Sequence, residues 1–157
     1  MRLAALLHRE TILLRLHARS KEEVLERLIA TLPATGLVRN VEEVHRAIFE
    51  REQRMTTCVG GGVALPHSKT HAVVAPVAAL ATLEPPMLMD APDHRPVEIV
   101  FLLVGCQDNI GAHLRLLSRI SRLLTNASFR MHLLQAQNPQ QVLELFEQAE
   151  ELHQADL

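Results

Sequence analysis

The sequence predicts an α/β fold in which one mixed β-sheet lies between helices at the two ends of the chain. Apolar residues recur at the helical period of about 3.6 in residues 21–54 and 112–152. Residues 56–104 are instead rich in Val, Ala, Pro and Gly without that period, which indicates strands and turns. Because 157 residues suit one domain, we expect residues 1–157 to form a single domain.

The first expected elements are a strand and a helix. Residues 11–18 are mainly apolar, which favours a strand. Ser20 and Glu23 have the spacing of a capping box, in which two side chains accept hydrogen bonds from the first free N–H groups of a helix. Pro33 and Gly36 end this first helix.

The capping pattern is repeated further along the chain. Asn40 followed by Glu43 predicts a second helix that runs to about Arg54. Three more helices are expected: one over 112–124, a short one after the cap Asn126, and one over 139–152 after the cap Asn138.

The middle of the chain contains three expected strands, at 63–65, 73–83 and 97–104. The last reads VEIVFLLV, and its nearly unbroken apolar run predicts a central strand buried on both faces. The segment DAPDHRP before it has the composition of a turn.

Composition excludes several classes of function. A net charge of −2 and the absence of Trp and Tyr disfavour nucleic acid as a partner. The amino terminus lacks a signal peptide, and the longest weakly polar stretch is shorter than the roughly 20 residues that a membrane crossing needs. We therefore expect a cytoplasmic protein without membrane insertion, whose two cysteines are reduced.

The stretch TTCVGGGVALPHSKT, residues 56–70, raises the question of function. Its three glycines suggest a phosphate-binding loop, but Pro-His-Ser-Lys stands where a Walker motif needs Gly-Lys-Ser. Leu65 occupies the position where a dinucleotide fingerprint needs glycine. Neither nucleotide motif is present.

Two other interpretations of this stretch stay open from the residues alone. A metal site built from Cys58, His67, His71 and His113 needs a helix to bring the first two histidines together, and Pro66 argues against one. A tight turn followed by an ordinary surface histidine is the plainer alternative. Against that plain interpretation, Pro66 gives His67 a rigid mount, which suits a nucleophile.

The segment REQRMTTCVGGGVALPHSK, residues 51–69, resembles the active-site segment of the enzyme IIA components of the phosphoenolpyruvate-dependent sugar phosphotransferase system, of the fructose/mannitol and nitrogen-regulatory class. The coinciding residues are Arg51, Glu52, Thr57, Gly60, Gly62, Ala64, Pro66 and His67. MDAPDHRPV at 89–97 and HLRLLSRISRLL at 113–124 are similar to two further family motifs.

This resemblance implies a three-layer αβα sandwich around a mixed sheet. It implies that His67 takes a phosphoryl group from the histidine-containing phosphocarrier protein and passes it to a IIB partner. His113 is implied as a second active-site histidine and Arg51 as a nearby basic residue, with neither a cofactor nor a metal. Neutral imidazole is a competent nucleophile toward phosphorus near neutral pH, so the chemistry agrees.

A regulatory alternative stays open. In it, phosphorylation of His67 switches contacts with a target protein and no sugar is transported. The absence of a IIB or membrane segment in this sequence favours that alternative. Lys69 and His71 are expected to be peripheral, whereas the glycine turn and the N–H groups around Ser68 are candidate donors to the phosphoryl oxygens.

The sequence also departs from the family pattern at Cys58, Gly61 and Ser68.

Overall fold

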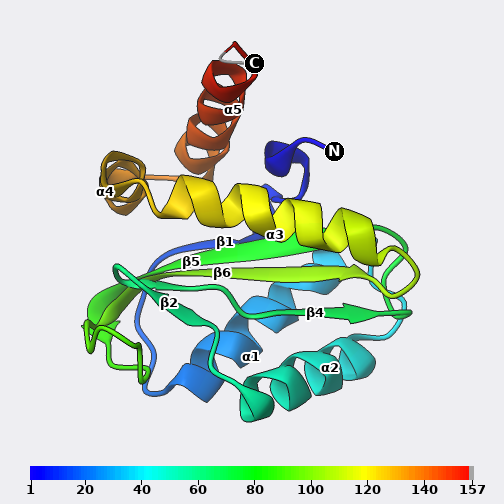
Figure 1. Cartoon of the computed structure of the whole chain (residues 1–157). Coiled ribbons are helices and arrows are strands. Elements are labelled where there is room, and N and C mark those ends of the chain that lie inside the picture. Colours follow the sequence, from blue (N-terminus) through cyan, green and yellow to red (C-terminus); the bar gives the residue numbers. More distant parts are fainter. Residues whose placement is uncertain (156–157) are drawn as a thin grey trace.

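The computed structural model describes residues 1–155, so the last two residues of the expected domain 1–157 lie outside the described residues. That single-domain expectation stays a prediction. Six strands form one sheet (Figure 1): β1 (Ile12–Leu16), β2 (Cys58–Gly60), β3 (Val63–Ala64), β4 (His67–Thr70), β5 (Val77–Met87) and β6 (Val97–Cys106). The helices are α1 (Lys21–Thr31), α2 (Val41–Arg54), α3 (Ile110–Leu124), α4 (Ala127–Gln135) and α5 (Pro139–Ala155).

The sheet is mixed, as predicted. Its strand order is β1-β5-β6-β3-β2, with β4 also paired to β6. β5 runs antiparallel to β6, whereas β3 and β4 follow one another along the other edge of β6 and are both parallel to it. The short strand β4 therefore has a second edge that no strand covers among the described residues.

Strand β6 is the centre of the molecule, which confirms the prediction of a central strand. Its side chains alternate between the two faces of the sheet. One face receives Val100, Leu102 and Val104, and the other receives Ile99, Phe101 and Leu103, all of them at most 1% exposed.

Helices cover both faces of the sheet, and this gives the predicted three-layer αβα sandwich (Figure 1). Helices α1 and α2 pack on one face, and α3, α4 and α5 pack on the other. A short 3-10 turn, η1 (Leu3–Ala5), completes the second outer layer beside α5. Within residues 1–155, no helix combines the length and the apolar character that a membrane crossing requires.

The predicted caps begin the helices. Ser20 and Asn40 accept hydrogen bonds from the backbone N–H groups of Glu23 and Glu43, each at 3.1 Å. Half of the expected capping box is absent, because the Glu23 carboxylate accepts from the N–H of Arg19 instead of Ser20. Asn126 and Asn138 also cap their helices as predicted.

Several boundaries differ from the predictions. The strand expected at 73–83 begins at Val77 and continues to Met87. The helices expected at 112–124 and 139–152 extend to Ile110–Leu124 and Pro139–Ala155. β2 and β4 were not predicted as strands at all, because Cys58–Gly60 is very short and HSKT lacks the apolar alternation of a strand.

Candidate functional site

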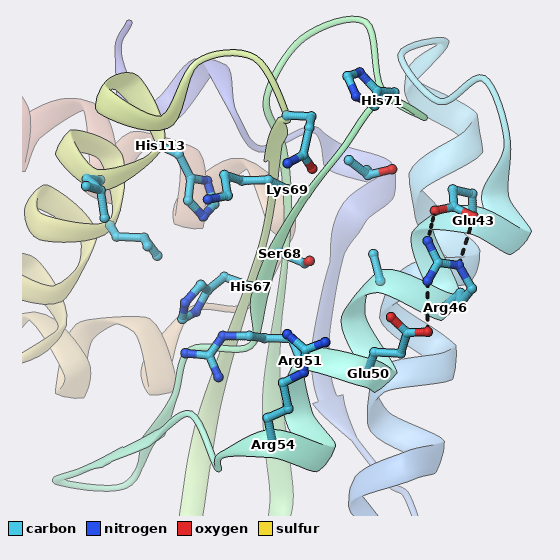
Figure 2. A pocket seen from close by; sticks show the side chains of 15 residues that line it. Glu43, Arg46, Glu50, Arg51, Arg54, His67, Ser68, Lys69, His71 and His113 are labelled. Carbon is cyan, nitrogen blue, oxygen red and sulfur yellow. Dashed lines mark hydrogen bonds and ion pairs between the residues drawn. The ribbon is translucent and has the colours of Figure 1, made fainter.

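A pocket of about 590 Å³ lies over the uncovered edge of β4, between α2 and the beginning of α3 (Figure 2). Its chemistry is dominated by basic and imidazole side chains. They are Arg46, Arg51 and Arg54 from α2, Lys69 from β4, and His67, His71 and His113.

His67 is the first residue of β4, and the backbone holds it on both sides. The carbonyl of Pro66 accepts the N–H of Leu103 at 3.0 Å, and His67 itself lies opposite Leu103 in the ladder with β6. The histidine therefore begins a strand that the sequence did not predict. The backbone at His67 is thus held by pairing with the central strand β6, in addition to the restriction that Pro66 imposes.

The ring of His67 is fixed in one tautomer. Its Nδ1 lies 2.7 Å from the carbonyl oxygen of Leu65. A carbonyl only accepts hydrogen bonds, so Nδ1 must carry the proton. The lone pair is thereby left on Nε2, the nitrogen available to a reacting group.

The electrostatic surroundings keep His67 neutral at neutral pH. Partial burial lowers the pKa of its imidazole below 6.5, and the hydrogen bond to the Leu65 carbonyl opposes this in part. The positive charges of Arg51 and Lys69 lower the pKa further, and the negative charge of Glu52 raises it. A neutral ring retains the lone pair that a nucleophile needs.

His113 lies beside His67, on the first turns of α3. The two ring centroids are 5.8 Å apart, with the planes inclined by 46°. His113 is only 5% exposed, and its pKa falls to about 4 because of burial first, and then because of the nearby His67 and Lys69. Its Nδ1 has no hydrogen-bond partner among the described residues.

Gly105, near the end of β6, makes room for this histidine. A Cβ atom on Gly105 would lie 2.3 Å from Nδ1 of His113, far inside van der Waals contact. Only a residue without a side chain allows α3 to bring His113 this close to the sheet.

Part of the positive charge in the pocket has no ion-pair partner among the described residues. Arg46 is paired with Glu43 and with Glu50. In contrast, Arg51, Arg54 and Lys69 form no ion pair within the part of the chain that the structure describes. Figure 2 shows Arg51 and Lys69 directed toward the His67–His113 pair. The pocket is therefore suited to an anion with several oxygens.

Alternation along β4 separates the residues that follow His67. His67 and Lys69 point toward α3, whereas Ser68 points to the opposite side, toward α2 (Figure 2). The hydroxyl of Ser68 is therefore directed away from the histidine pair.

The structure brings together the three residues predicted from the sequence, since His67, His113 and Arg51 line the same pocket. The glycine turn is not part of it. The N–H of Gly61 donates to the carboxylate of Asp93 at 2.8 Å and is thus already used. The expectation that this turn supplies donors to the site was wrong.

The other candidates lie elsewhere or at the margin. Cys58 is buried, and its thiol donates to the carbonyl of Met89. His71 lies 3.7 Å from Asp108 and is exposed. Among the described residues, no group of three or more His, Cys, Asp or Glu side chains is arranged to hold a metal ion.

Sequence reasoning missed three contributors: Arg54, Gly105 and the carbonyl of Leu65. Arg54 follows Arg51 by three positions and so shares its helix face, a signal that was available. The roles of Gly105 and Leu65 come from packing and backbone geometry, which no local pattern reports. Lys69, expected to be peripheral, acts on the pKa of both histidines.

Comparison with known proteins agrees with this site. A family model described as "Phosphoenolpyruvate-dependent sugar phosphotransferase system, EIIA 2" matches residues 5–149. The nitrogen regulatory protein of Escherichia coli K12 is 31% identical over 96% of this chain and 92% of its own length. The fructose-specific EIIABC component of Bacillus subtilis is 29% identical over 94% of this chain, which spans only 23% of that protein.

A solved structure gives the same result. The nitrogen regulatory protein IIA-Ntr from Neisseria meningitidis superposes with a TM-score of 0.84 at 27% identity, covering 92% of this chain and 98% of that one. With a family match that spans most of its length and a fold held in common with such proteins, the chain belongs to the EIIA 2 family of the phosphoenolpyruvate-dependent sugar phosphotransferase system.

Proposed function

We propose that Nε2 of His67 accepts a phosphoryl group from the histidine-containing phosphocarrier protein and then passes it to a IIB partner in the cytoplasm. The observation that supports this most directly is the 2.7 Å contact between Nδ1 of His67 and the Leu65 carbonyl. It leaves Nε2 as the nucleophilic atom, in a pocket whose free cations are suited to a phosphoryl group.

The transfer is a displacement at phosphorus. The lone pair of Nε2 forms a new P–N bond while the bond between phosphorus and the donor's imidazole nitrogen breaks, and its electron pair stays on the donor. The ring of His67 keeps its Nδ1 proton and becomes cationic. The Leu65 carbonyl then accepts a hydrogen bond from a charged N–H, which is stronger than one from a neutral ring.

The neighbours stabilise charge on the transferring group. Arg51 and Lys69 are directed toward the site and offset the negative oxygens as the group moves between two nitrogens. His113 lies close enough to His67 for its ring N–H to face a phosphoryl oxygen on Nε2, and it is neutral at neutral pH.

A regulatory role is the second candidate, and the comparison with the nitrogen regulatory protein favours it. That relative is 31% identical to this chain over 96% of this chain's residues. In this role a dianionic group on His67 would change the charge of the pocket and thereby the affinity for a target protein.

Intact mass measurement tests the shared step. After incubation with phosphoenolpyruvate, enzyme I and the phosphocarrier, we expect an acid-labile gain of about 80 Da, one HPO₃ group, in the wild type and in His132→Ala, and none in His67→Ala. Retention of the adduct by His67→Ala would refute the assignment of the nucleophile.

Partner capture separates the two roles. The phosphorylated and unphosphorylated proteins are immobilised in parallel and offered a purified IIB domain. Transfer of labelled phosphate to that domain supports transport. Failure to transfer, together with phosphorylation-dependent binding of a protein that is not a IIB component, supports regulation.

A further inference from the structure

We propose that Glu52, held between Lys21 and Thr57, is a positioning residue that fixes the orientation and the basicity of His67. This inference rests on the proposed function, because it concerns the same nucleophile. Glu52 is not among the residues that line the pocket. It acts on His67 through consecutive hydrogen bonds that involve Thr57 and Leu65.

The contacts begin with the buried carboxylate of Glu52. The side chain of Glu52 is 6% exposed, at the carboxyl end of α2. One carboxylate oxygen lies 2.5 Å from Nζ of Lys21, the first residue of α1, and the other accepts a hydrogen bond from the hydroxyl of Thr57. A buried carboxylate with a cation and a hydroxyl on its two oxygens is held in one position.

Thr57 transmits that position to the backbone around His67. Thr57 lies between α2 and β2 and belongs to neither element. Its side-chain hydrogen bond to Glu52 therefore fixes a residue that no strand pairing or helix holds in place. The carbonyl of Thr57 accepts the N–H of Leu65 at 3.0 Å. The carbonyl of Leu65 in turn accepts the Nδ1–H of His67 at 2.7 Å.

Leu65 is the link that most needs this support. It lies between β3 and β4 and belongs to neither strand. Its N–H and its carbonyl are nevertheless both used, one toward Thr57 and the other toward the ring. Displacing Thr57 therefore moves the carbonyl that selects the tautomer of His67.

Charge gives Glu52 a second effect on the same ring. When Nε2 accepts a phosphoryl group the imidazole becomes cationic, and a nearby buried anion stabilises that state. The other charged groups that act on the pKa of His67 are Arg51 and Lys69, both of them cationic, and the pocket carboxylates Glu43 and Glu50 are paired with Arg46. Glu52 is the anion that acts on His67.

Two substitutions separate these effects. Glu52→Gln keeps the shape and the acceptor for Thr57 but removes the charge. Thr57→Val keeps the shape and removes the hydroxyl, whereas Thr57→Ser restores it. The chain supplies matched controls on other elements: Glu150, a carboxylate 3% exposed and paired with Arg119, and Thr82, a buried threonine whose hydroxyl accepts the N–H of Arg15.

Nitrogen-15 NMR of the histidine rings tests this inference without any phosphoryl donor, because it measures the pKa and the tautomer of His67. In Glu52→Gln we expect the pKa of His67 to fall below that of the wild type, because an anion is lost. In Thr57→Val we expect the fraction of the Nδ1–H tautomer to decrease. Thr57→Ser, Glu150→Gln and Thr82→Val are expected to keep the wild-type ring signals.

Transfer kinetics provide the second readout. Glu52→Gln and Thr57→Val should lower kcat about fivefold or more with little change in KM for the phosphocarrier, because orientation and basicity are altered but the docking surface is intact. The controls should show wild-type kinetics even where they reduce thermal stability.

Wild-type ring signals and wild-type kcat in both Glu52→Gln and Thr57→Val overturn the inference. So does an equal loss of kcat in Glu150→Gln and Thr82→Val, since that would reflect stability alone. If Glu52→Gln does not fold, Thr57→Val set against Thr57→Ser decides the question. A wild-type protein that accepts no phosphate refutes the proposed function instead, and the NMR comparison still decides the role of Glu52.

Discussion

His67 and His113 show how the surroundings of a residue decide its chemistry. Both are imidazoles in the same pocket, and both have a pKa below the ordinary value because burial disfavours the charged ring. Only His67 has a partner that fixes its tautomer, the carbonyl of Leu65. His113, whose Nδ1 has no hydrogen-bond partner among residues 1–155, is better suited to assist a neighbour than to attack.

Removing the assisting residues should slow the transfer but not abolish the fold. We expect His113→Ala and Arg51→Ala each to lower kcat/KM for phosphoryl transfer by about tenfold or more, equivalent to roughly 1.4 kcal/mol of barrier. Stopped-flow or quench-flow transfer from the phosphocarrier measures this. Rates within a factor of about two of the wild type in both variants would contradict their assignment.

The lowered pKa of His113 predicts a pH-dependent stability. The ring titrates near 6.5 when unfolded and at about 4 when folded. Between these pH values the unfolded state binds more protons, so the free energy of unfolding falls as the pH drops from 6.5 toward 4. Allowing for screening at the pocket mouth, the loss due to His113 is about 2 kcal/mol.

Urea denaturation of the wild type and His113→Asn at pH values across that range measures the effect. The stability of the wild type should fall more steeply with acid than that of the variant. Parallel curves for the two proteins would show that the folded-state pKa of His113 is not lowered.

At the scale of the element, strand β6 and helix α3 together set the distance between the two histidines. β6 positions β4 and therefore His67, and the glycine near its end lets α3 approach. Position 105 must therefore lack a side chain, although Gly105 takes no part in the chemistry of the pocket.

Gly105→Ala should therefore impair both packing and transfer. The new methyl group would meet Nδ1 of His113 at 2.3 Å and force the ring or the helix to shift. Overpacking of this kind costs about 1 to 3 kcal/mol, and we expect transfer to slow about as much as in His113→Ala. Unchanged transfer with full stability would disprove the steric argument.

Gly36→Ala is the matched control for this prediction. Gly36 has a φ of 75°, and an added Cβ there would meet no atom within 4 Å. The variant is expected to lose about 1 kcal/mol of stability through backbone strain and to transfer phosphate normally.

Elements with strong local signals could be predicted from the sequence, and those defined by pairing could not. The apolar run 97–104 identified β6, because a strand buried on both faces needs apolar residues throughout. The caps Ser20 and Asn40 identified α1 and α2, because these residue types are preferred at the start of a helix. β4 was missed because HSKT is polar and becomes a strand only through its partner β6. For the same reason the sequence indicated His67 after Pro66 but not the Leu65 carbonyl, whereas Arg51 and His113 were implied only by the resemblance to the family.

At the scale of the whole molecule, a buried carboxylate joins three parts of the chain on the face that carries α3. Glu150 of α5 accepts hydrogen bonds from the N–H of Ala4 at 2.8 Å and from Arg119 of α3 at 3.1 Å. Arg119 also donates to the carbonyl of Met1. The amino terminus, α3 and α5 are thereby tied together, away from the pocket.

Glu150→Ala should destabilise the protein without changing the chemistry. Losing the carboxylate leaves Arg119 and the N–H of Ala4 without this acceptor, and we expect a loss of about 3 kcal/mol in the free energy of unfolding. Chemical denaturation measures the loss, and the transfer rate of the folded protein should equal that of the wild type. A loss below about 1 kcal/mol would mean that solvent replaces these contacts.

In the proposed transfer, Nε2 of His67 is the atom that carries the phosphoryl group. Phosphorus–nitrogen coupling in the phosphorylated protein, with its histidines labelled with nitrogen-15, tests this claim most directly. We expect one phosphorus signal coupled to Nε2 of His67, with the Nδ1 proton retained and hydrogen-bonded. Coupling to Nδ1, or to a nitrogen of another histidine such as His113, would contradict it.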